Sequence, residues 1–382
     1  MTDRAIKRVL YANAWWNQEI LNGTMKHAAE HGWHLNIQPC LTGELPRRWN
    51  GDGIITLLGD TEGLGQLIES SGCPVVSLNA NYPELHLPTV SQDSSIAGSM
   101  AAEHFLERGF TSFVYYSAKP LTSHTETRFV AFQKRLHEAG KEVLTLIPPP
   151  AAKNDPSVGW EHRGRWLEEM LPSLPKPVAI FAYNDQDAVE LIEVCIARSI
   201  SVPDEIAVLG MHDMPLFRHS AGISLSSVST DRDQMTKTAC DLLADLMDGS
   251  PAPDRPILLP PTGVAARAST DTLAASDPRV AKTLRFMIDH HADTIGLTDF
   301  VRVSGVCKTV LYEAFNRELG RSPYAVLSAI RFERAKRMLR HSNEKLRAVA
   351  YSCGFGTPEN LFRCFKLELS ISPGEYRKRS AR

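Results

Sequence analysis

The sequence predicts a two-lobed α/β domain with parallel, doubly wound sheets, followed by an all-α domain that contains two helix-turn-helix units. Three observations support this prediction. Short apolar runs alternate with helical patterns from residue 6 to residue 265. Two pairs of short helices, each joined at a glycine, lie near the C-terminus. The charge also divides the chain, because residues 281–382 carry 19 Lys and Arg against 10 Asp and Glu, whereas the remainder carries 23 against 34.

Strand and helix patterns alternate throughout the first part of the chain. Because the expected strands are apolar on both faces, they favour parallel sheets covered by helices. They are too numerous for one compact sheet, which indicates two lobes. Strands are expected at Arg8–Ala12, Leu35–Gln38, Gly53–Leu57, Pro74–Leu78, Thr89–Ser91, Ser112–Tyr116, Glu142–Leu146, Val178–Ala182, Ile206–Gly210 and Ser226–Ser229. Helices are expected at Gln18–His31, Gly63–Ser70, Ser95–Arg108, Thr127–Ala139, Trp160–Leu171, Asp187–Ala197 and Asp231–Met247.

The most specific local pattern lies near the C-terminus. An apolar-periodic helix beginning near Leu346 stops at Gly354, a residue that suits the left-handed conformation ending a helix. Thr357 can cap the next helix, with Pro358 at its first position, where a missing N–H costs little. That helix buries Leu361, Cys364 and Phe365 and directs basic side chains outward. The pattern is typical of a helix-turn-helix.

The same plan occurs once upstream, with a helix at Leu297–Val303, a turn at Gly305 and a second helix at Lys308–Leu319. A long basic helix at Ala325–Leu339 links the two units. Together with the Gly-Phe, Leu-x-Arg-x-Phe-Lys and Ser-Pro-x-x-Tyr-Arg patterns, this arrangement resembles the AraC/XylS family of transcription regulators. Two positions depart from that family's pattern. Cys307 is a poor cap for the first recognition helix, and Ser370 replaces the usual glycine, so we expect a different turn there.

The resemblance implies that DNA is the partner of this domain, and the basic charge agrees with it. Arg363 and Lys308 are the best candidates for guanine edges. Glu313 and Glu359 either accept from cytosine or are ordinary surface and helix-start charges. The linking helix carries Arg331, Arg334, Lys336 and Arg337, some of which we expect to be phosphate or solvent contacts rather than readers of sequence. The candidate DNA-binding residues are Lys308, Thr309, Tyr312, Glu313, Asn316, Pro358, Glu359, Phe362 and Arg363.

Polar and aromatic residues gather where the expected strands of the α/β part end. Ligands of doubly wound sheets lie beyond the carboxyl ends of the strands. Flat rings can stack on the C–H face of a sugar, while Asp, Asn and Arg side chains exchange hydrogen bonds with hydroxyl groups. These residue types in this position therefore favour a carbohydrate site.

The segments Phe181–Ala188, Ser199–Asp213 and Leu225–Val228 resemble the ligand-binding domain of the LacI/GalR family, which shares its fold with periplasmic sugar-binding proteins. A sensor of this type followed by an AraC-type domain is similar to the bacterial xylose-operon regulators, which are activators. The resemblance implies D-xylose as the effector. It also implies the ligand-binding residues Asn13, Trp15, Trp16, Asp93, Arg128, Asn184 and Asp213, with Thr230 as a further candidate.

Each of these residues also has a structural interpretation. Trp15 and Trp16 are alternatively core or interface aromatics. Asp93 is alternatively the N-cap of the helix that follows. Asn184 and Asp185 alternatively serve the hinge between lobes, and Asp213 alternatively caps a turn. Effectors other than xylose, such as another pentose, a hexose or a purine, remain open.

The domain boundaries follow from composition. Residues 264–280 are small and polar, which is typical of a connector. We expect the ligand-binding domain at 1–267, a linker at 268–276 and the DNA-binding domain at 277–382. The resemblance further implies a homodimer, in which sugar-driven closure of the lobes alters how the recognition helices are presented, and contact with RNA polymerase at activated promoters.

Several other classes are excluded or disfavoured by motifs. Seven scattered cysteines without a Cys-x-x-Cys pair indicate neither a zinc site nor a disulfide framework, and we expect no cofactor. No nucleophile elbow, phosphate loop or metal-ligand cluster is present, which disfavours a sugar-processing enzyme. The expected absence of a signal peptide and of a transmembrane segment disfavours a transport-type binding protein and indicates a cytoplasmic protein without membrane contact.

Overall fold

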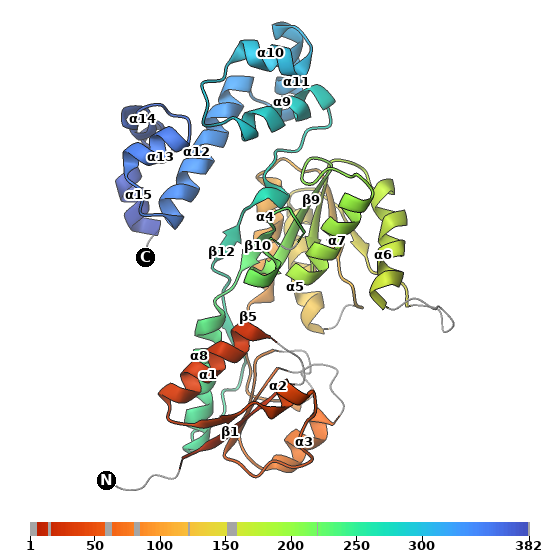
Figure 1. Cartoon of the computed structure of the whole chain (residues 1–382), viewed down its shortest axis with the longest axis vertical. Coiled ribbons are helices and arrows are strands. Elements are labelled where there is room, and N and C mark those ends of the chain that lie inside the picture. Colours follow the sequence, from red (N-terminus) through yellow and green to blue (C-terminus); the bar gives the residue numbers. More distant parts are fainter. Residues whose placement is uncertain are drawn as a thin grey trace.

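The computed structural model describes residues 6–13, 17–57, 63–79, 85–120, 123–150, 159–219 and 221–380. Two α/β lobes and a helical domain follow one another along the long axis of the molecule (Figure 1). Both α/β lobes are built mainly from parallel strands, as predicted. The chain crosses between the lobes more than once, so each lobe contains segments that are far apart in the sequence.

The first lobe is organised around a four-stranded parallel sheet in the order β2-β1-β3-β4. Its strands are β1 (Arg8–Ala12), β2 (His34–Asn36), β3 (Gly53–Thr56) and β4 (Val75–Ser77), and a short parallel pair adds β5 (Val90–Gln92) and β11 (Ile257–Leu259). Helices α1 (Gln18–Glu30) and α8 (Arg232–Met247) pack side by side on one face. The lobe also contains α2 (Gln38–Thr42) and α3 (Leu64–Ser71).

The second lobe has a six-stranded sheet in the order β12-β10-β9-β8-β6-β7. Helices cover both faces, and each face has its own apolar core. The strands are β6 (Ser112–Tyr116), β7 (Val143–Leu146), β8 (Val178–Ala182), β9 (Ile206–His212), β10 (Ser226–Ser229) and β12 (Gly263–Ala265). The helices are α4 (Ser94–Leu106), α5 (Ser123–Glu138), α6 (Gly159–Met170) and α7 (Asp185–Ala197).

Besides short 3₁₀ turns, the sequence analysis missed one short helix and two short strands of the α/β part. Helix α2 spans only five residues, and β11 and β12 have three residues each. Strand β12 is also antiparallel to β10, so the second sheet is not wholly parallel. Such short segments carry too few residues for a periodic pattern, and tertiary pairing defines them.

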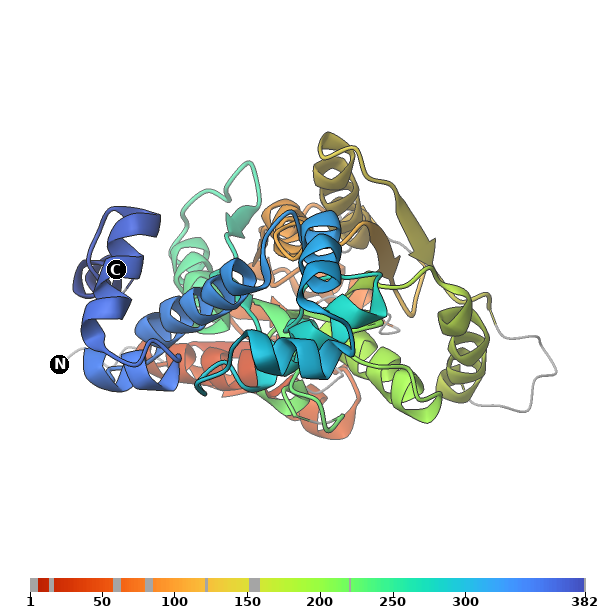
Figure 2. The ribbon, with the colours of Figure 1, turned by 90° about the horizontal axis from the view of Figure 1, so that it is seen from above.

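The helical domain contains the two predicted helix-turn-helix units on either side of α12 (Pro323–His341), as Figures 1 and 2 show. Helix α12 contributes Val326 and Leu327 to the core of the first unit and Phe332, Ala335 and Leu339 to that of the second. The first unit comprises α9 (Pro278–Asp289), α10 (Leu297–Ser304) and α11 (Lys308–Leu319). The second comprises α13 (Leu346–Ser352), α14 (Pro358–Leu369) and α15 (Pro373–Ser380).

The predicted caps and turns of these units are confirmed, with one exception. The side chain of Thr357 caps α14, whereas Cys307 provides no side-chain cap for α11. The exception is Ser370. We expected a different turn at this position, but Ser370 has a φ of 59°, close to the 63° of Gly320 at the same place in the first unit. The backbone turn is the same, and a serine adopts the left-handed conformation that glycine tolerates better.

Replacing Ser370 should therefore stabilise the second unit. In Ser370→Gly, relief of the left-handed conformation should raise the local free energy of unfolding by about 1 kcal/mol. Hydrogen exchange of amides in α14, measured by mass spectrometry in the full chain, reports this as increased protection. The matched control is Gly320→Ser, which should lower protection in α11. Unchanged or faster exchange in α14 of Ser370→Gly would contradict the interpretation.

Candidate effector site and DNA-binding surface

The carboxyl ends of β8 and β9 bring candidate residues of the second lobe together. Both strands are parallel and adjacent, so Asn184 and Asp213, which follow them, lie at the same edge of the sheet. Arg128 reaches this edge from α5 and donates from Nη1 to the backbone carbonyl of Tyr183. Three predicted ligand-binding residues therefore converge on one edge.

Arg128 is fully buried, with no side-chain exposure. Its guanidinium lies 4.9 Å from the centre of the Tyr183 ring. Within the described ranges, Nε and Nη2 have no hydrogen-bond partner. A buried arginine with unsatisfied N–H groups is costly, because these groups have lost water without gaining another acceptor. A ligand that offers oxygen acceptors at this position would satisfy them.

Asp213 is largely buried and has a left-handed backbone, with a φ of 54°. Its carboxylate accepts hydrogen bonds from Arg218 Nε at 3.1 Å and from the Ser229 hydroxyl at 3.2 Å. It also forms an ion pair with Arg267 Nη1 at 2.8 Å. Its own N–H donates to the Ser227 hydroxyl. Two arginines therefore already pair with this carboxylate, and a ligand must compete with or rearrange them.

The remaining predicted ligand residues have structural roles or fall outside the described part. Asn184 Oδ1 caps α7 by accepting from the Asp187 N–H at 2.8 Å. Asp93 caps α4 through the N–H groups of Ser95 and Ile96, which is the alternative interpretation of this residue. Asn13 is buried after β1, and its Nδ2 lies 3.3 Å from the Tyr11 hydroxyl. Trp15 and Trp16 lie outside the described residues.

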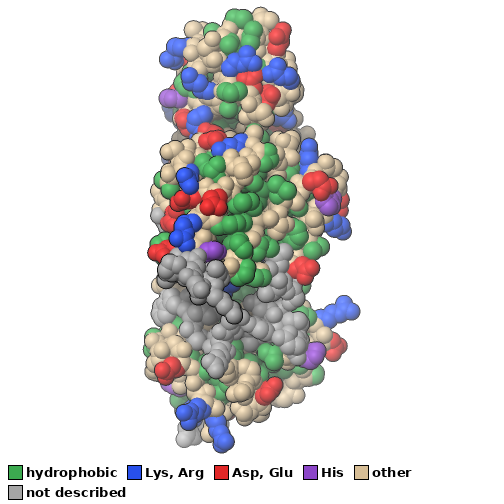
Figure 3. All heavy atoms as spheres, turned by 90° about the vertical axis from the view of Figure 1, so that its right-hand side faces the viewer, with side chains coloured by type: hydrophobic (Ala, Val, Ile, Leu, Met, Phe, Trp, Pro, Cys, Tyr) green, Lys and Arg blue, Asp and Glu red, His purple; other side chains and the backbone are tan. Residues whose placement is uncertain are grey.

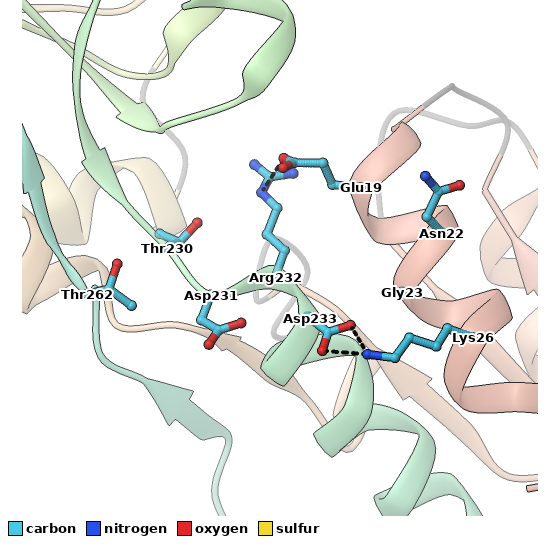
Figure 4. A pocket seen from close by; sticks show the side chains of 9 residues that line it. All are labelled: Glu19, Asn22, Gly23, Lys26, Thr230, Asp231, Arg232, Asp233 and Thr262. Atoms are coloured by element: carbon cyan, nitrogen blue, oxygen red, sulfur yellow. Dashed lines mark hydrogen bonds and ion pairs between the residues drawn. The ribbon is translucent and has the colours of Figure 1, made fainter. Parts of the chain in front are cut away.

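A pocket of about 480 Å³ lies beside the junction of the lobes (Figure 4). Arg232, at the start of α8, donates to Asn17 Oδ1 at 3.2 Å and lies 3.5 Å from Glu19. Burial raises the pKa of Glu19, and the charges of Arg232 and Arg218 oppose that rise. Arg218 belongs to the second lobe, so Glu19 faces charges from both lobes. The pocket is lined by Glu19, Asn22, Gly23, Lys26, Thr230, Asp231, Arg232, Asp233 and Thr262.

Sequence reasoning missed Glu19, Arg218, Arg232 and Arg267 as part of this region. Their charges are ordinary for helix starts and turns, so the residue types alone give no signal. Thr230, by contrast, was a further candidate, and it lines the pocket. The position of Arg232 directly after an Asp N-cap at the end of a buried strand is the one local clue.

Asp185 is a buried carboxyl beside the same strand ends. It accepts from the Met214 N–H at 2.7 Å and from the Ser227 hydroxyl at 2.6 Å. Gly210 on β9 leaves room for it, because a Cβ there would lie 2.3 Å from Asp185 Oδ1. Burial raises the pKa of Asp185 from its ordinary 3.8 to about 7, and the two hydrogen bonds only partly oppose this.

The predicted recognition helices present their candidate residues to the surface. On α11, Lys308, Thr309, Glu313 and Asn316 are exposed, and Tyr312 is half-buried beneath the Lys308 ammonium, 5.7 Å from the ring centre. On α14, the exposed candidates are Glu359, Phe362 and Arg363, with Pro358 half-buried. Hydrogen bonds from the backbone N–H of Glu359 and from Thr357 lower the pKa of Glu359. Figure 3 shows Lys and Arg side chains on this domain, at the top of the view.

Three arginines of the linking helix bind the protein itself. Arg331 donates to the carbonyls of His291 and Asp293, each at 2.8 Å. Arg334 pairs with Asp271, and Arg337 donates to the carbonyl of Ala266 at 3.0 Å. Arg334 and Arg337 thus join the helical domain to the segment that leads into it. These three side chains are therefore not the phosphate or solvent contacts expected on this helix, because folded backbone and carboxylate acceptors lie within reach.

Comparisons with known proteins agree with this architecture. Residues 102–270 match a family described as periplasmic binding protein-like domain, and residues 301–379 match a helix-turn-helix domain. The xylose operon regulatory protein of Escherichia coli strain K12 is 25% identical over 379 residues, which cover 96% of this chain and 95% of that protein. The Haemophilus influenzae protein of the same name is 26% identical over 337 residues, covering 85% and 84%.

A solved structure shows the same domains in the same order. It is described as the structure of xylose-binding transcription activator xylR, and it has a TM-score of 0.65 and 24% identity. The match covers 99% of this chain and all of that one. The chain is a transcription regulator. It joins a LacI/GalR-like ligand-binding domain to an AraC-type DNA-binding domain, which confirms the prediction from sequence.

The chain is therefore a DNA-binding regulator and not an enzyme. In the described ranges, no three His, Cys, Asp or Glu side chains are grouped so that they could hold a metal ion. No helix there is both long and apolar enough to cross a membrane.

The buried Asp185 should make the stability of the regulator depend on pH. The pKa of this carboxyl is near 3.8 in the unfolded chain and about 7 in the folded chain. Between these two pH values, only the unfolded chain releases the proton. The free energy of unfolding should therefore fall as pH rises from about 4 to 7, by up to about 1.4 kcal/mol per pH unit from this group. Urea denaturation across this range should show a flatter pH profile for Asp185→Asn than for the exposed control Asp254→Asn. Equal slopes in both variants would contradict the assignment.

Proposed function

We propose that the chain is a sugar-responsive transcription regulator whose effector binds between the lobes of residues 1–267. A linker at 268–276 connects this sensor to the DNA-binding domain at 277–382. D-xylose is our first candidate for the effector. Sugar binding would favour one arrangement of the lobes and so change how the recognition helices meet the operator.

The main support for the effector site is the buried and incompletely hydrogen-bonded side chain of Arg128. Two nitrogens of this fully buried guanidinium lack partners among described residues, directly beside the strand ends that also hold Asn184 and Asp213. Sugar hydroxyls accept from N–H groups and donate to carboxylates, so one ligand can engage both kinds of residue. Asn13, Trp15 and Trp16 would contribute from the first lobe, and Asp93 would act at the crossover between lobes.

Xylose as the effector is supported by the names of relatives that match most of this chain. Identity near 25% leaves room for a different pocket. Another pentose, a hexose or a purine therefore remains the alternative effector, with the same architecture and the same site.

For DNA recognition we assign the exposed residues of α11 and α14 to the major groove. Arg363 and Lys308 would donate to guanine edges. Thr309, Tyr312, Asn316, Pro358 and Phe362 would complete the surface, with Glu313 and Glu359 placed to accept from cytosine. Arg363 is partly oriented by Asn360, whose Oδ1 accepts from Nη2 at 3.1 Å.

The proposal includes a homodimer that presents four recognition helices, activation through contact with RNA polymerase, and action in the cytoplasm, where the operator lies. The net positive charge of residues 281–382 supports the DNA contact.

A thermal-shift screen tests the effector. The purified chain is heated with D-xylose, arabinose, ribose, glucose, galactose and purines. A ligand that binds the folded state raises the melting temperature by mass action. We expect D-xylose to give the largest rise. A rise with another compound would replace the effector, and no rise with any of them would contradict the sugar-sensor proposal.

Asp213→Ala should abolish the response to sugar while leaving non-specific DNA affinity unchanged, because the carboxylate lies in the sensor and not in the DNA-binding domain. Isothermal titration with D-xylose and fluorescence anisotropy with random-sequence DNA measure the two properties. Asp254→Ala, an exposed position, is the control. Loss of DNA affinity in Asp213→Ala would show that this residue is structural.

Arg363→Ala should weaken binding to the operator by about 1–3 kcal/mol and relax base preference at one position. Selection of bound sequences from a random pool, followed by titration of the selected site, measures both effects. Arg255→Ala, an exposed arginine of the sensor, should change neither. Uniform weakening over all sequences would instead make Arg363 a phosphate contact.

A further inference from the structure

Residues 266–271 lie against the second lobe and the DNA-binding domain at the same time. On the sensor side, Ser269 donates to the Val208 carbonyl at 2.6 Å and Thr270 contacts His104 at 2.9 Å. On the other side, α12 contributes Arg334 and Arg337, which bind Asp271 and the Ala266 carbonyl. A movement of this segment would therefore be transmitted to α12.

Further contacts fix the same junction. Arg285 of α9 pairs with Asp204 at 2.8 Å, and Asp204 also accepts from Thr272 at 3.0 Å. In addition, Glu318 of α11 accepts from the Ser276 N–H at 2.8 Å. The DNA-binding domain is thus held on the sensor by these polar contacts together with those of Arg334 and Arg337.

Arg267 connects this segment to the candidate effector site. Its Nη1 donates to the Leu225 carbonyl at 2.7 Å and pairs with Asp213 Oδ1 at 2.8 Å. Its backbone N–H donates to the Ser226 hydroxyl, and the preceding residue, Ala266, accepts from Arg337. One peptide unit therefore separates the ion pair with Asp213 from a contact to the DNA-binding domain.

The carboxylate of Asp213 has little acceptor capacity to spare. Its Oδ1 pairs with Arg267 and accepts a hydrogen bond from Arg218 Nε. Its Oδ2 accepts hydrogen bonds from Arg218 Nη2 and from the Ser229 hydroxyl. A carboxylate accepts about four hydrogen bonds. A sugar hydroxyl that donates to Asp213 must displace one of these donors.

We propose that Arg267 is the positioning residue that couples effector binding to the DNA-binding domain. Without effector, its ion pair with Asp213 holds residues 266–271 in the observed position. An effector hydroxyl replaces Arg267 at Oδ1, and the segment shifts together with Arg334 and Arg337 on α12. Arg218 shares the carboxylate but lies in the turn after β9, so its displacement alone leaves the junction unchanged. The inference rests on the proposed function, because it needs an effector at Asp213.

Hydrogen exchange of the full chain, measured with and without D-xylose, tests the coupling without knowledge of the operator. In the wild type, xylose should speed exchange at least two-fold in peptides covering residues 266–271 and the facing turns of α12. In Arg267→Ala, exchange there should already be fast, and xylose should add nothing. Arg255→Ala, an exposed arginine of the sensor, is the control, which should respond as the wild type does, and Arg267→Lys should keep part of the response.

Isothermal titration separates this role from a merely structural one. Removal of a competitor for Asp213 should tighten xylose binding about five-fold in Arg267→Ala. Damage to the fold would weaken it instead. Arg337→Ala, on the other side of the junction, should lose the exchange response at unchanged xylose affinity.

The outcomes distinguish the two hypotheses. If the wild type binds neither xylose nor another screened sugar, the sensor assignment fails and the coupling fails with it. If the wild type binds a sugar but Arg267→Ala keeps the full exchange response, only the role of Arg267 is overturned. An equal loss of response in Arg255→Ala and Arg267→Ala would also overturn it, because the loss would then not depend on the ion pair with Asp213.

Discussion

The parallel pairing of β8 with β6 and β9 is the constraint on which the sensor depends. Parallel strands end at one edge, so the residues that follow them are neighbours regardless of their distance along the chain. Asn184 and Asp213 are almost thirty positions apart in the sequence, yet both lie at this edge. The buried apolar strands fix the edge, and the polar residues beyond them have freedom to vary with the ligand.

This edge holds an unusual density of buried ionisable groups. Arg128 is fully enclosed, Asp185 is almost so, and Asp213 shares its carboxylate with two arginines. Buried charges with incomplete or shared partners lower stability, and proteins retain them mainly where a ligand or a conformational change uses them. The position of these buried groups therefore agrees with a binding site at the strand ends. This argument does not depend on similarity to any relative.

Arginine serves two different purposes in the DNA-binding domain. On α12, Arg331, Arg334 and Arg337 have acceptors within the chain, so the positive charge of that helix stabilises the junction between domains. On α14, Arg363 points to solvent beside Asn360, where a base edge can replace water. The net charge of the domain is the sum of both kinds of arginine, so it does not distinguish those that bind within the chain from those available to DNA.

The sequence by itself determined most of the elements and their order. Apolar periodicity gave β1, β6, β8 and β10 with the observed bounds, and Gly354, Thr357 and Pro358 defined the second turn, because caps and turns depend on neighbouring residues. Only the tertiary structure decided which charges meet. Arg267 lies 54 positions from Asp213, and Arg337 lies 71 from Ala266, so no local pattern links them. The left-handed Ser370 belongs to the same class, since packing of the second unit overrides the preference of the residue.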